Sequence, residues 1–518
     1  MFRQTCLIQG YLPLAYPLTS KIIFMRIQQP IITMLLLLLS MINSSCKKLI
    51  SIPDPNDTMT TTQIFSNDKD AESSIAGVYS KMAYGPDDTP TQNFSSGLIT
   101  ILGGLSSGEL FHYAGPTGET NFYPYSTNKL NINNSNSSYK VWSTAYTTIY
   151  GANSVMEGVE ASTSSLLSDS VRKELTGEAK FVRAFTYFYL SNLFGDVPLA
   201  LTINFHKTIS LPRAPQRDVY LQIIKDLKDA MTLMPADYSV GKGKRTRPNK
   251  WAAAALLARV YLYTGDYINA AALSTEIINT TSLFKLEADL NNVFSTISRE
   301  AIWQLGLATG HYFLRNATPE GNIMVPAYST NTGTPIFGLS QELKNAFETG
   351  DERWVKWTGN TDNSMATGSP QGTTWYPYKY KLALGSSVVG GPEVEYYTPM
   401  RLAEQYLIRA EAIVNGAPGG LSAAIDDLNI IRDRADLPAL PYTLNKIQVM
   451  EAIAKERQVE LFAEWGHRWL DLKRTGRAHD VLITNPLKLP WIGDHQLLYP
   501  IPLEEIMKST FLIQTPGY

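Results

Sequence analysis

The segment Trp251–Ile278, with the sequence WAAAALLARVYLYTGDYINAAALSTEII, decides the expected fold. Its apolar residues recur at spacings of three and four, which is typical of helices that bury one face. The Thr-Gly-Asp step in its middle interrupts this pattern, because Gly265 ends a first helix and Asp266 caps a second. The small side chains of Ala258 and Ala270 allow the two helices to approach closely. The sequence therefore predicts a tight helical hairpin.

The spacing within this hairpin is that of a tetratricopeptide repeat. The positions that match are Leu257, Ala258, Tyr261, Gly265, Tyr267 and Ala270. A looser copy spans Arg401–Arg434, with a longer turn through Asn415–Gly420. Because the repeats are few and imperfect, we expect a helical scaffold with repeat-like hairpins and not a regular solenoid.

Two further stretches have helical periodicity. Val171–Phe194 places apolar residues on one face and is followed by Gly195 as a stop, and Val449–Arg474 is expected to form one helix. The predicted fold is therefore mainly α, with tetratricopeptide-like helix pairs that form a scaffold. This scaffold would support a loop-rich face with a few short strands.

Composition excludes several kinds of protein. The 518 residues include 45 basic and 47 acidic side chains, a net charge of -2, which argues against a protein built to neutralise nucleic-acid phosphates. The two cysteines, Cys6 and Cys46, both precede residue 50, and there is no CxxC motif. A thiolate zinc site and a redox dithiol are therefore excluded.

The N-terminus has the features of a secretion signal. Ile31–Ile42 is an apolar stretch of about twelve residues, too short for the ~20 of a membrane-spanning helix but suited to a signal-peptide core. Arg26 gives it a positive flank, and Met25 is an alternative translation start. Small residues then lead into Cys46, as in a bacterial lipobox, although Asn43 stands where an aliphatic residue is usual. We expect a lipid on Cys46; the alternative is an ordinary secretory peptide.

The expected domain organisation follows from these features. Residues 1–45 form the signal peptide, and residues 46–62 form the lipidated cysteine and a tether rich in Pro, Asp and Thr. Residues 63–518 form a single helical domain with insertions at about 89–136 and 305–399.

The long segments between the helices are expected to be binding loops or small strand pairs. They combine many aromatic residues with Asn, Ser and Thr. The CH face of a sugar ring stacks on an aromatic plane, and its hydroxyl groups need polar partners. The candidate ligand contacts are Phe111, Tyr113, Asn121, Tyr123, Tyr125, Tyr312 and Tyr328.

The search for catalytic motifs gives no positive case. Gly104–Gly108 matches the G-x-S-x-G nucleophile elbow, and Ile99–Leu102 before it is a candidate strand. The sequence after it contains Gly115-Pro116 and does not fit the helix that the elbow requires. We therefore expect no enzyme activity.

A metal site and a cofactor are not expected either. Glu464, His467 and Asp471 have the spacing of one helix face, but no second ligand cluster accompanies them, which favours a structural hydrogen-bond network. There is no P-loop, Rossmann fingerprint or EF-hand loop, so no cofactor is expected.

Several motifs together resemble one known family. They are Arg183-Ala-Phe-Thr-Tyr-Phe-Tyr-Leu190 with Leu193-Phe-Gly-Asp-Val-Pro-Leu199, the hairpin within Lys250–Ala271, the segment Tyr406–Arg434, Glu456-Arg-Gln-Val-Glu460 with Gly466-His-Arg-Trp-Leu-Asp-Leu-Lys-Arg474, Tyr499-Pro-Ile-Pro502, and the ending Gln514-Thr-Pro-Gly-Tyr518. The chain resembles the SusD-like (SusD/RagB) nutrient-uptake lipoproteins of the Gram-negative outer membrane. The resemblance covers nearly the whole mature chain.

This resemblance implies a lipid-anchored protein on the outer membrane, facing the cell exterior. Such a protein binds a nutrient, usually a glycan, without cleaving it, and delivers it to a TonB-dependent SusC-like transporter. The family's ligand contacts lie in variable loops, so no site residue transfers from it. Three alternatives stay open: a peptide-binding protein of the same fold, a glycoside hydrolase with two loop carboxylates, and a pure protein-interaction scaffold.

Overall fold

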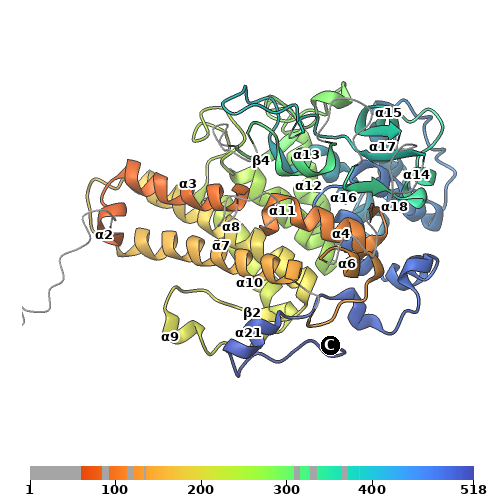
Figure 1. Ribbon diagram of the computed structural model, residues 1–518. Helices are drawn as coiled ribbons and strands as arrows, with labels where there is room; N and C mark the ends of the chain where they lie inside the picture. The colour runs from red at the N-terminus through yellow and green to blue at the C-terminus, as the bar shows by residue number, and fades with distance from the viewer. Residues whose placement is uncertain are drawn as a thin grey trace, which may run out of the picture. The chain divides into compact units, whose positions relative to one another are not determined.

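Long helices lie side by side in a row in the computed structural model (Figure 1). Each packs against the next in the order α7 (Asn136–Ala161), α8 (Asp169–Phe194), α10 (Gln216–Leu233), α11 (Lys250–Thr264), α12 (Tyr267–Asn279), α16 (Leu402–Val414) and α17 (Gly420–Arg434). Helix α3 (Asp68–Tyr84) covers α7 and α8, and α18 (Lys446–Glu460) covers α16 and α17. All these helices contribute to one continuous hydrophobic core, so the mainly α fold is confirmed.

The structure describes residues 60–84, 93–113, 121–133, 136–307, 315–326, 335–362, 372–383 and 385–518. Within these, Thr61–Tyr518 form one compact unit. The signal peptide, the lipidation site Cys46 and the candidate contacts Tyr312 and Tyr328 lie outside the described residues. No helix in the described ranges is both long and apolar enough to cross a membrane.

The hairpin predicted at Trp251–Ile278 is confirmed as α11 and α12. The Asn249 side chain caps α11 by accepting from the backbone N–H groups of Trp251 and Ala252. Gly265 adopts a φ of 77°, a left-handed conformation that suits glycine, and the Asp266 side chain accepts from Asn269 to start α12. The predicted helices at Val171–Phe194 and in Arg401–Arg434 are also confirmed, as α8 and as α16 with α17.

The prediction of one helix over Val449–Arg474 is wrong. Helix α18 ends at Glu460 and α19 (His467–Arg474) begins after a sharp turn in which Ala463, Trp465 and Gly466 have φ values of 49°, 48° and 70°. The turn lies against Gly103, where an added Cβ would stand 2.6 Å from the Gly466 Cα. Close backbone approach at this point therefore breaks the helix.

The candidate strand at Ile99–Leu102 is a helix. Residues Ile99–Ser107 form α4, in which every residue is buried, and a short π-helical turn, Phe94–Leu98, precedes it. A short apolar run fits a buried helix as well as a buried strand, because neither has a polar face. The segment 89–136, expected to be non-helical, thus contributes α4 to the core and also contains α6 (Tyr123–Thr127).

Within the described ranges the strands form four separate antiparallel pairs. They are β1 (Leu110–His112) with β5 (Phe337–Leu339), β2 (Val197–Pro198) with β3 (Arg213–Ala214), β4 (Ala301–Leu305) with β8 (Tyr397–Arg401), and β6 (Thr358–Asp362) with β7 (Thr373–Pro377). The insertions between the helices supply short strand pairs, as the sequence predicts, but the insertion at 305–399 also contains the short helices α13 (Pro319–Met324), α14 (Gln341–Ala346) and α15 (Glu352–Trp357).

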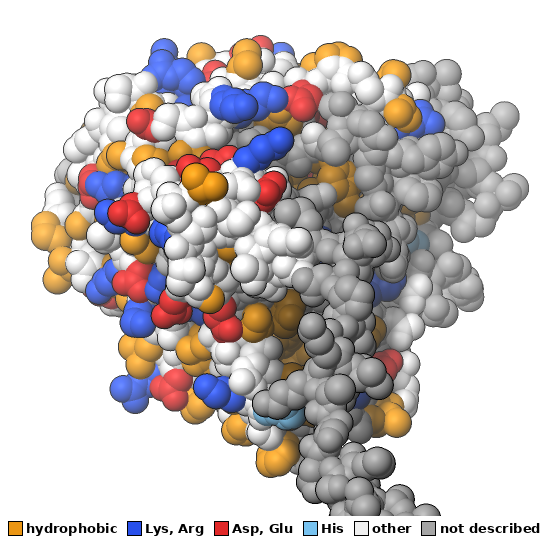
Figure 2. Space-filling view, turned by 90° about the vertical axis from the view of Figure 1, so that its left-hand side faces the viewer, with side chains coloured by type: hydrophobic (Ala, Val, Ile, Leu, Met, Phe, Trp, Pro, Cys, Tyr) orange, Lys and Arg blue, Asp and Glu red, His pale blue; other side chains and the backbone are white. Residues whose placement is uncertain are grey.

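Charges of both signs are mixed on one face of the molecule. Figure 2 shows Lys and Arg side chains interspersed with Asp and Glu on the face at the left of Figure 1. This mixture fits the near-neutral composition of the chain.

Candidate functional site

The hairpin formed by β6 and β7 presents an aromatic and polar face to solvent. Its register pairs Asn360 with Trp375 and Asp362 with Thr373, and directly opposed residues of an antiparallel pair point to the same side. Asn360, Asp362 and Thr373 are exposed, and Trp375 is half-buried. We call these four residues, together with Trp354, the hairpin face.

Trp354 comes from the short helix α15 (Glu352–Trp357). Its ring lies 4.5 Å from that of Trp375, centroid to centroid, with the planes inclined by 44°. Three residues later Trp357 points inward, is fully buried, and donates from Nε1 to the Leu290 carbonyl at 2.9 Å. The buried tryptophan fixes the helix, and the other remains half-buried at the surface.

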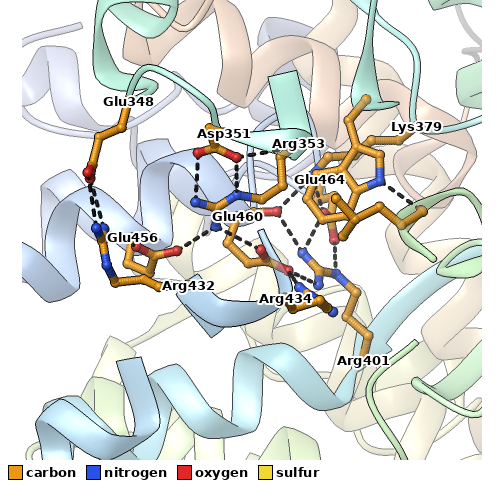
Figure 3. A network of polar contacts seen from close by, with 12 residues as sticks. Glu348, Asp351, Arg353, Lys379, Arg401, Arg432, Arg434, Glu456, Glu460 and Glu464 are labelled. Carbon is orange, nitrogen blue, oxygen red and sulfur yellow. Dashed lines mark hydrogen bonds and ion pairs between the residues drawn. The ribbon is translucent and has the colours of Figure 1, made fainter. Parts of the chain in front are cut away.

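A buried network of charges holds α15 in place (Figure 3). Arg353 is fully buried and donates to Asp351 from Nε at 2.9 Å and from Nη2 at 2.8 Å. Its Nη1 donates to Glu460 at 3.0 Å and to Glu456, both on α18. Figure 3 shows these carboxylates converging on the guanidinium from two elements. The arginine therefore fastens α15 to the helical scaffold.

Lys379, two residues after β7, fastens the second strand at the same end of the hairpin, because Thr358 of β6 and Pro377 of β7 are directly opposed. Its ammonium group donates to the Glu460 carbonyl at 2.8 Å and to the Glu464 carboxylate. It also lies 4.5 Å from the ring centroid of Trp357 and 4.2 Å from that of Phe462. Burial lowers the pKa of Lys379 to about 8, although Glu464 opposes this shift.

Arg401 and Arg434 complete the network. Arg401 donates to Glu300 and Glu464, each at 2.9 Å, and to Glu460, while Arg434 donates to Glu300 at 2.6 Å and to Glu460. Burial acts to raise the pKa of Glu460, but Arg434, Arg401 and Arg353 together hold it well below its usual value. The carboxylate is therefore ionised, and the network forms a rigid support for the hairpin.

Phe111 and Tyr113 lie on the opposite side of the hairpin. Their rings are 4.8 Å apart and both cover Gly338 of β5, where an added Cβ would come within 2.5 Å of Phe111. The Tyr113 hydroxyl donates to Thr374, whose side chain points away from the hairpin face because neighbours along a strand alternate. Phe111 is half-buried, whereas Tyr113 is only 8% exposed.

The other candidate contacts differ in accessibility. Tyr125 is 0% exposed, donates or accepts at 2.6 Å with Ser138, and packs edge-on against Tyr499 at 5.2 Å. It belongs to the core, so the expectation that it stacks on a sugar is wrong. Asn121 is exposed and Tyr123 is half-buried at the start of α6, so both are accessible to a ligand.

The match to G-x-S-x-G at Gly104–Gly108 does not have the geometry of a nucleophile elbow. Ser106 lies inside α4, is 1% exposed, and its hydroxyl is 3.1 Å from that of Tyr499. The elbow needs an exposed serine on a strand-to-helix turn, and here Gly108 is simply the left-handed cap that ends the helix.

Glu464, His467 and Asp471 do not share one helix face. Glu464 lies in the turn before α19 and bonds to Arg401, whereas Asp471 bonds to Arg457 at 2.7 Å. Burial lowers the pKa of His467 to about 4, so the imidazole is neutral. No group of three or more His, Cys, Asp or Glu residues within the described ranges has the geometry of a metal site.

None of the five residues of the hairpin face was among the candidate contacts predicted from the sequence. The signal for Trp354 was its spacing of three from Trp357, in a six-residue helix too short for a periodicity argument. Asn360 gave no signal, because its position beside Trp375 depends on a strand pairing across a long connection.

Two family models match the chain. One, described as starch-binding and associating with the outer membrane, matches residues 108–262, and the model of the SusD family matches residues 320–518. SusD-like protein P2 of Formosa agariphila is 28% identical over 425 residues, which cover 73% of this chain and 80% of that protein. The starch-binding protein SusD of Bacteroides thetaiotaomicron is 24% identical over 430 residues, which cover 68% of this chain and 74% of that protein.

A solved structure of a laminarin binding SusD-like protein has the same fold. It superposes with a TM-score of 0.71 at 24% sequence identity, covering 88% of this chain and 100% of that chain. At this identity the likeness supports the architecture of the helical row and the strand pairs, and leaves the ligand open.

Proposed function

The chain belongs to the SusD family, and we propose that it is an outer-membrane surface lipoprotein that binds an oligosaccharide at the hairpin face. In this proposal a lipid on Cys46 anchors the protein, and the bound glycan passes uncleaved to a TonB-dependent transporter. The matching relatives include proteins whose names refer to starch and laminarin, which favours a glycan as the ligand class.

The observation that carries the proposal is the pair of Trp354 and Trp375 beside exposed polar side chains. An aromatic plane accepts the CH face of a sugar ring, and Asn360 and Asp362 provide a donor and acceptors for its hydroxyl groups. Because both tryptophans rest on elements fixed by the buried network, the platform is organised before the ligand arrives, which lowers the entropic cost of binding.

Some of the candidate contacts predicted from the sequence are proposed to extend the binding surface beyond the hairpin face. Phe111, Asn121 and Tyr123 are proposed to contact a ligand long enough to pass around the hairpin. Tyr312 and Tyr328 stay predictions, and Tyr113 is proposed only as a support for Phe111.

Calorimetry tests the proposal. The mature chain starting at residue 46 with Cys46→Ser, which lacks the lipid, is titrated with plant, host and microbial oligosaccharides, and with peptides as the contrast set. Saturable binding of one glycan class is expected, with an affinity loss of about 1–3 kcal/mol in Trp375→Ala, by analogy with base stacking on aromatic side chains. Tyr442→Ala is the control. It removes a 60% exposed tyrosine that does not belong to the hairpin face, and the variant is expected to bind the glycan normally. Binding of peptides alone would contradict the proposal.

A further inference from the structure

A pocket of about 420 Å³ is formed by α16, α18 and α19. Its lining combines apolar side chains, among them Ile447, Met450 and Leu472, with five basic and three acidic side chains. The residues of the hairpin face are not among its lining residues. An apolar pocket with an excess of positive charge suits a ligand that combines an apolar body with an anionic group.

Arg457 is one of the residues that line this pocket, and it has two unused donors. The side chain is only 2% exposed, and its Nε donates to Asp471 at 2.7 Å. Nη1 and Nη2 are buried and have no hydrogen-bond partner within the described residues. Buried donors without partners are costly, so an acceptor at this position would stabilise the arrangement.

The nearby carboxylates are already engaged by Arg474. This residue donates to both oxygens of Glu411, at 2.5 and 2.8 Å, and to Asp471 at 2.8 Å. Neither carboxylate makes a hydrogen bond to Nη1 or Nη2 of Arg457. That side of the guanidinium therefore lacks an acceptor within the described residues.

Two more arginines add positive charge to the pocket. Arg468 is 12% exposed at its side chain, and the carboxylate of Glu342 is 3.9 Å away, beyond hydrogen-bond distance. Arg477 is exposed and lines the same pocket. Both attract an anion toward Arg457.

We propose that this pocket binds an amphiphilic carboxylate, independently of the glycan site. The two oxygens of a carboxylate match the parallel N–H groups of Nη1 and Nη2, and an alkyl chain covers the apolar walls. An inorganic anion would satisfy the arginine but leave Ile447, Met450 and Leu472 uncovered. The apolar walls therefore favour a carboxylate with a hydrocarbon body.

The test uses the mature chain with Cys46→Ser and three probes: octanoate, octylamine and inorganic sulfate. Calorimetry is expected to show saturable binding of octanoate, at least tenfold weaker binding of sulfate, and no binding of octylamine. Arg457→Lys keeps the positive charge but removes the paired N–H groups of Nη1 and Nη2, and it should weaken octanoate binding at least tenfold. Arg217→Gln, which removes an exposed charge on α10, is the control and should bind octanoate normally.

Ile447→Glu keeps the test decisive if Arg457→Lys fails to fold. This side chain is 70% exposed at the pocket, so the change should leave folding intact, and the added carboxylate should repel octanoate and weaken its binding about tenfold. No saturable binding of octanoate would overturn the proposal. So would octanoate binding that neither variant changes, or sulfate binding as tightly as octanoate.

Discussion

Helix α15 joins two regions of opposite character within one turn. Arg353 is fully buried and bonds to carboxylates from two elements, whereas the next residue, Trp354, lies half-buried and contacts the rings of Trp375 and Phe347. The buried network fixes the position of the helix, and the adjacent aromatic surface can vary without disturbing it. We therefore predict that the buried charge network, called the frame below, and the proposed binding surface contribute separately to stability and to affinity, although they are adjacent in sequence.

The largest expected effect comes from breaking the frame. Arg401→Met leaves Glu300, Glu460 and Glu464 with too few cationic partners in a buried setting, which should cost about 3–5 kcal/mol of unfolding free energy. Urea denaturation measures it. Lys244→Met breaks the exposed pair with Glu393 and serves as the control, with an expected loss below about 1 kcal/mol. Equal losses in both variants would contradict the account of the frame.

The next effect is expected at the binding surface. Trp354→Ala removes one half of the tryptophan pair and should lower glycan affinity by about 1–3 kcal/mol. Because the two rings touch, the double variant with Trp375→Ala should lose less affinity than the two single losses added together. Calorimetry on all three variants checks this, and strictly additive losses would show that the rings do not form one platform.

The next prediction concerns the pH dependence of the free energy of unfolding, which we expect from the buried carboxyl group of Glu320. Glu320 on α13 (Pro319–Met324) is buried, and burial raises its pKa to about 8, against the lowering effect of hydrogen bonds from Thr100 and Tyr397. The folded state thus keeps a proton that the unfolded state releases above its pKa near 4.5. Stability should therefore fall as pH rises from about 4.5 to about 8, by at most about 1.4 kcal/mol per pH unit.

Glu320→Gln tests this pH dependence because the amide has the shape of the protonated acid. The variant should lose less stability than the parent chain between pH 5 and pH 8, as measured by urea denaturation at both values. An unchanged pH profile would show that Glu320 is not the titrating group.

The smallest effect is expected from a polar contact. Asn360 is exposed beside Trp375, so Asn360→Ala should weaken glycan binding by about 0.5–1.5 kcal/mol and change the stability by less than about 0.5 kcal/mol. Calorimetry and thermal unfolding of the same sample measure both quantities. If the free energy of unfolding falls by more than the free energy of binding, Asn360 supports the fold and not the ligand.

Helices with a strong apolar period could be predicted from the sequence, and contacts between distant segments could not. The hairpin of α11 and α12 was predictable because local spacing and the Gly265 turn determine it. The break between α18 and α19 was not, because it depends on close contact with Gly103 of α4, more than 350 residues earlier in the chain.

The candidate site was predictable only in its chemistry. Aromatic residues in the insertions pointed to stacking, but burial separates Tyr125 in the core from Trp375 at the surface, and composition does not report burial. Arg457 was recognised in a family motif, yet its unused donors depend on how Arg474 engages the neighbouring carboxylates. Such pairings are set by tertiary packing.

The most direct test of the separation between frame and surface measures glycan affinity and unfolding free energy on one variant, Trp375→Ala. The account predicts an affinity loss of about 1–3 kcal/mol with a smaller loss of stability, because Trp375 lies outside the buried charge network. The hairpin face is not the binding surface if this variant binds glycan as tightly as the parent chain. The same conclusion follows if the loss of binding free energy is no larger than the loss of unfolding free energy.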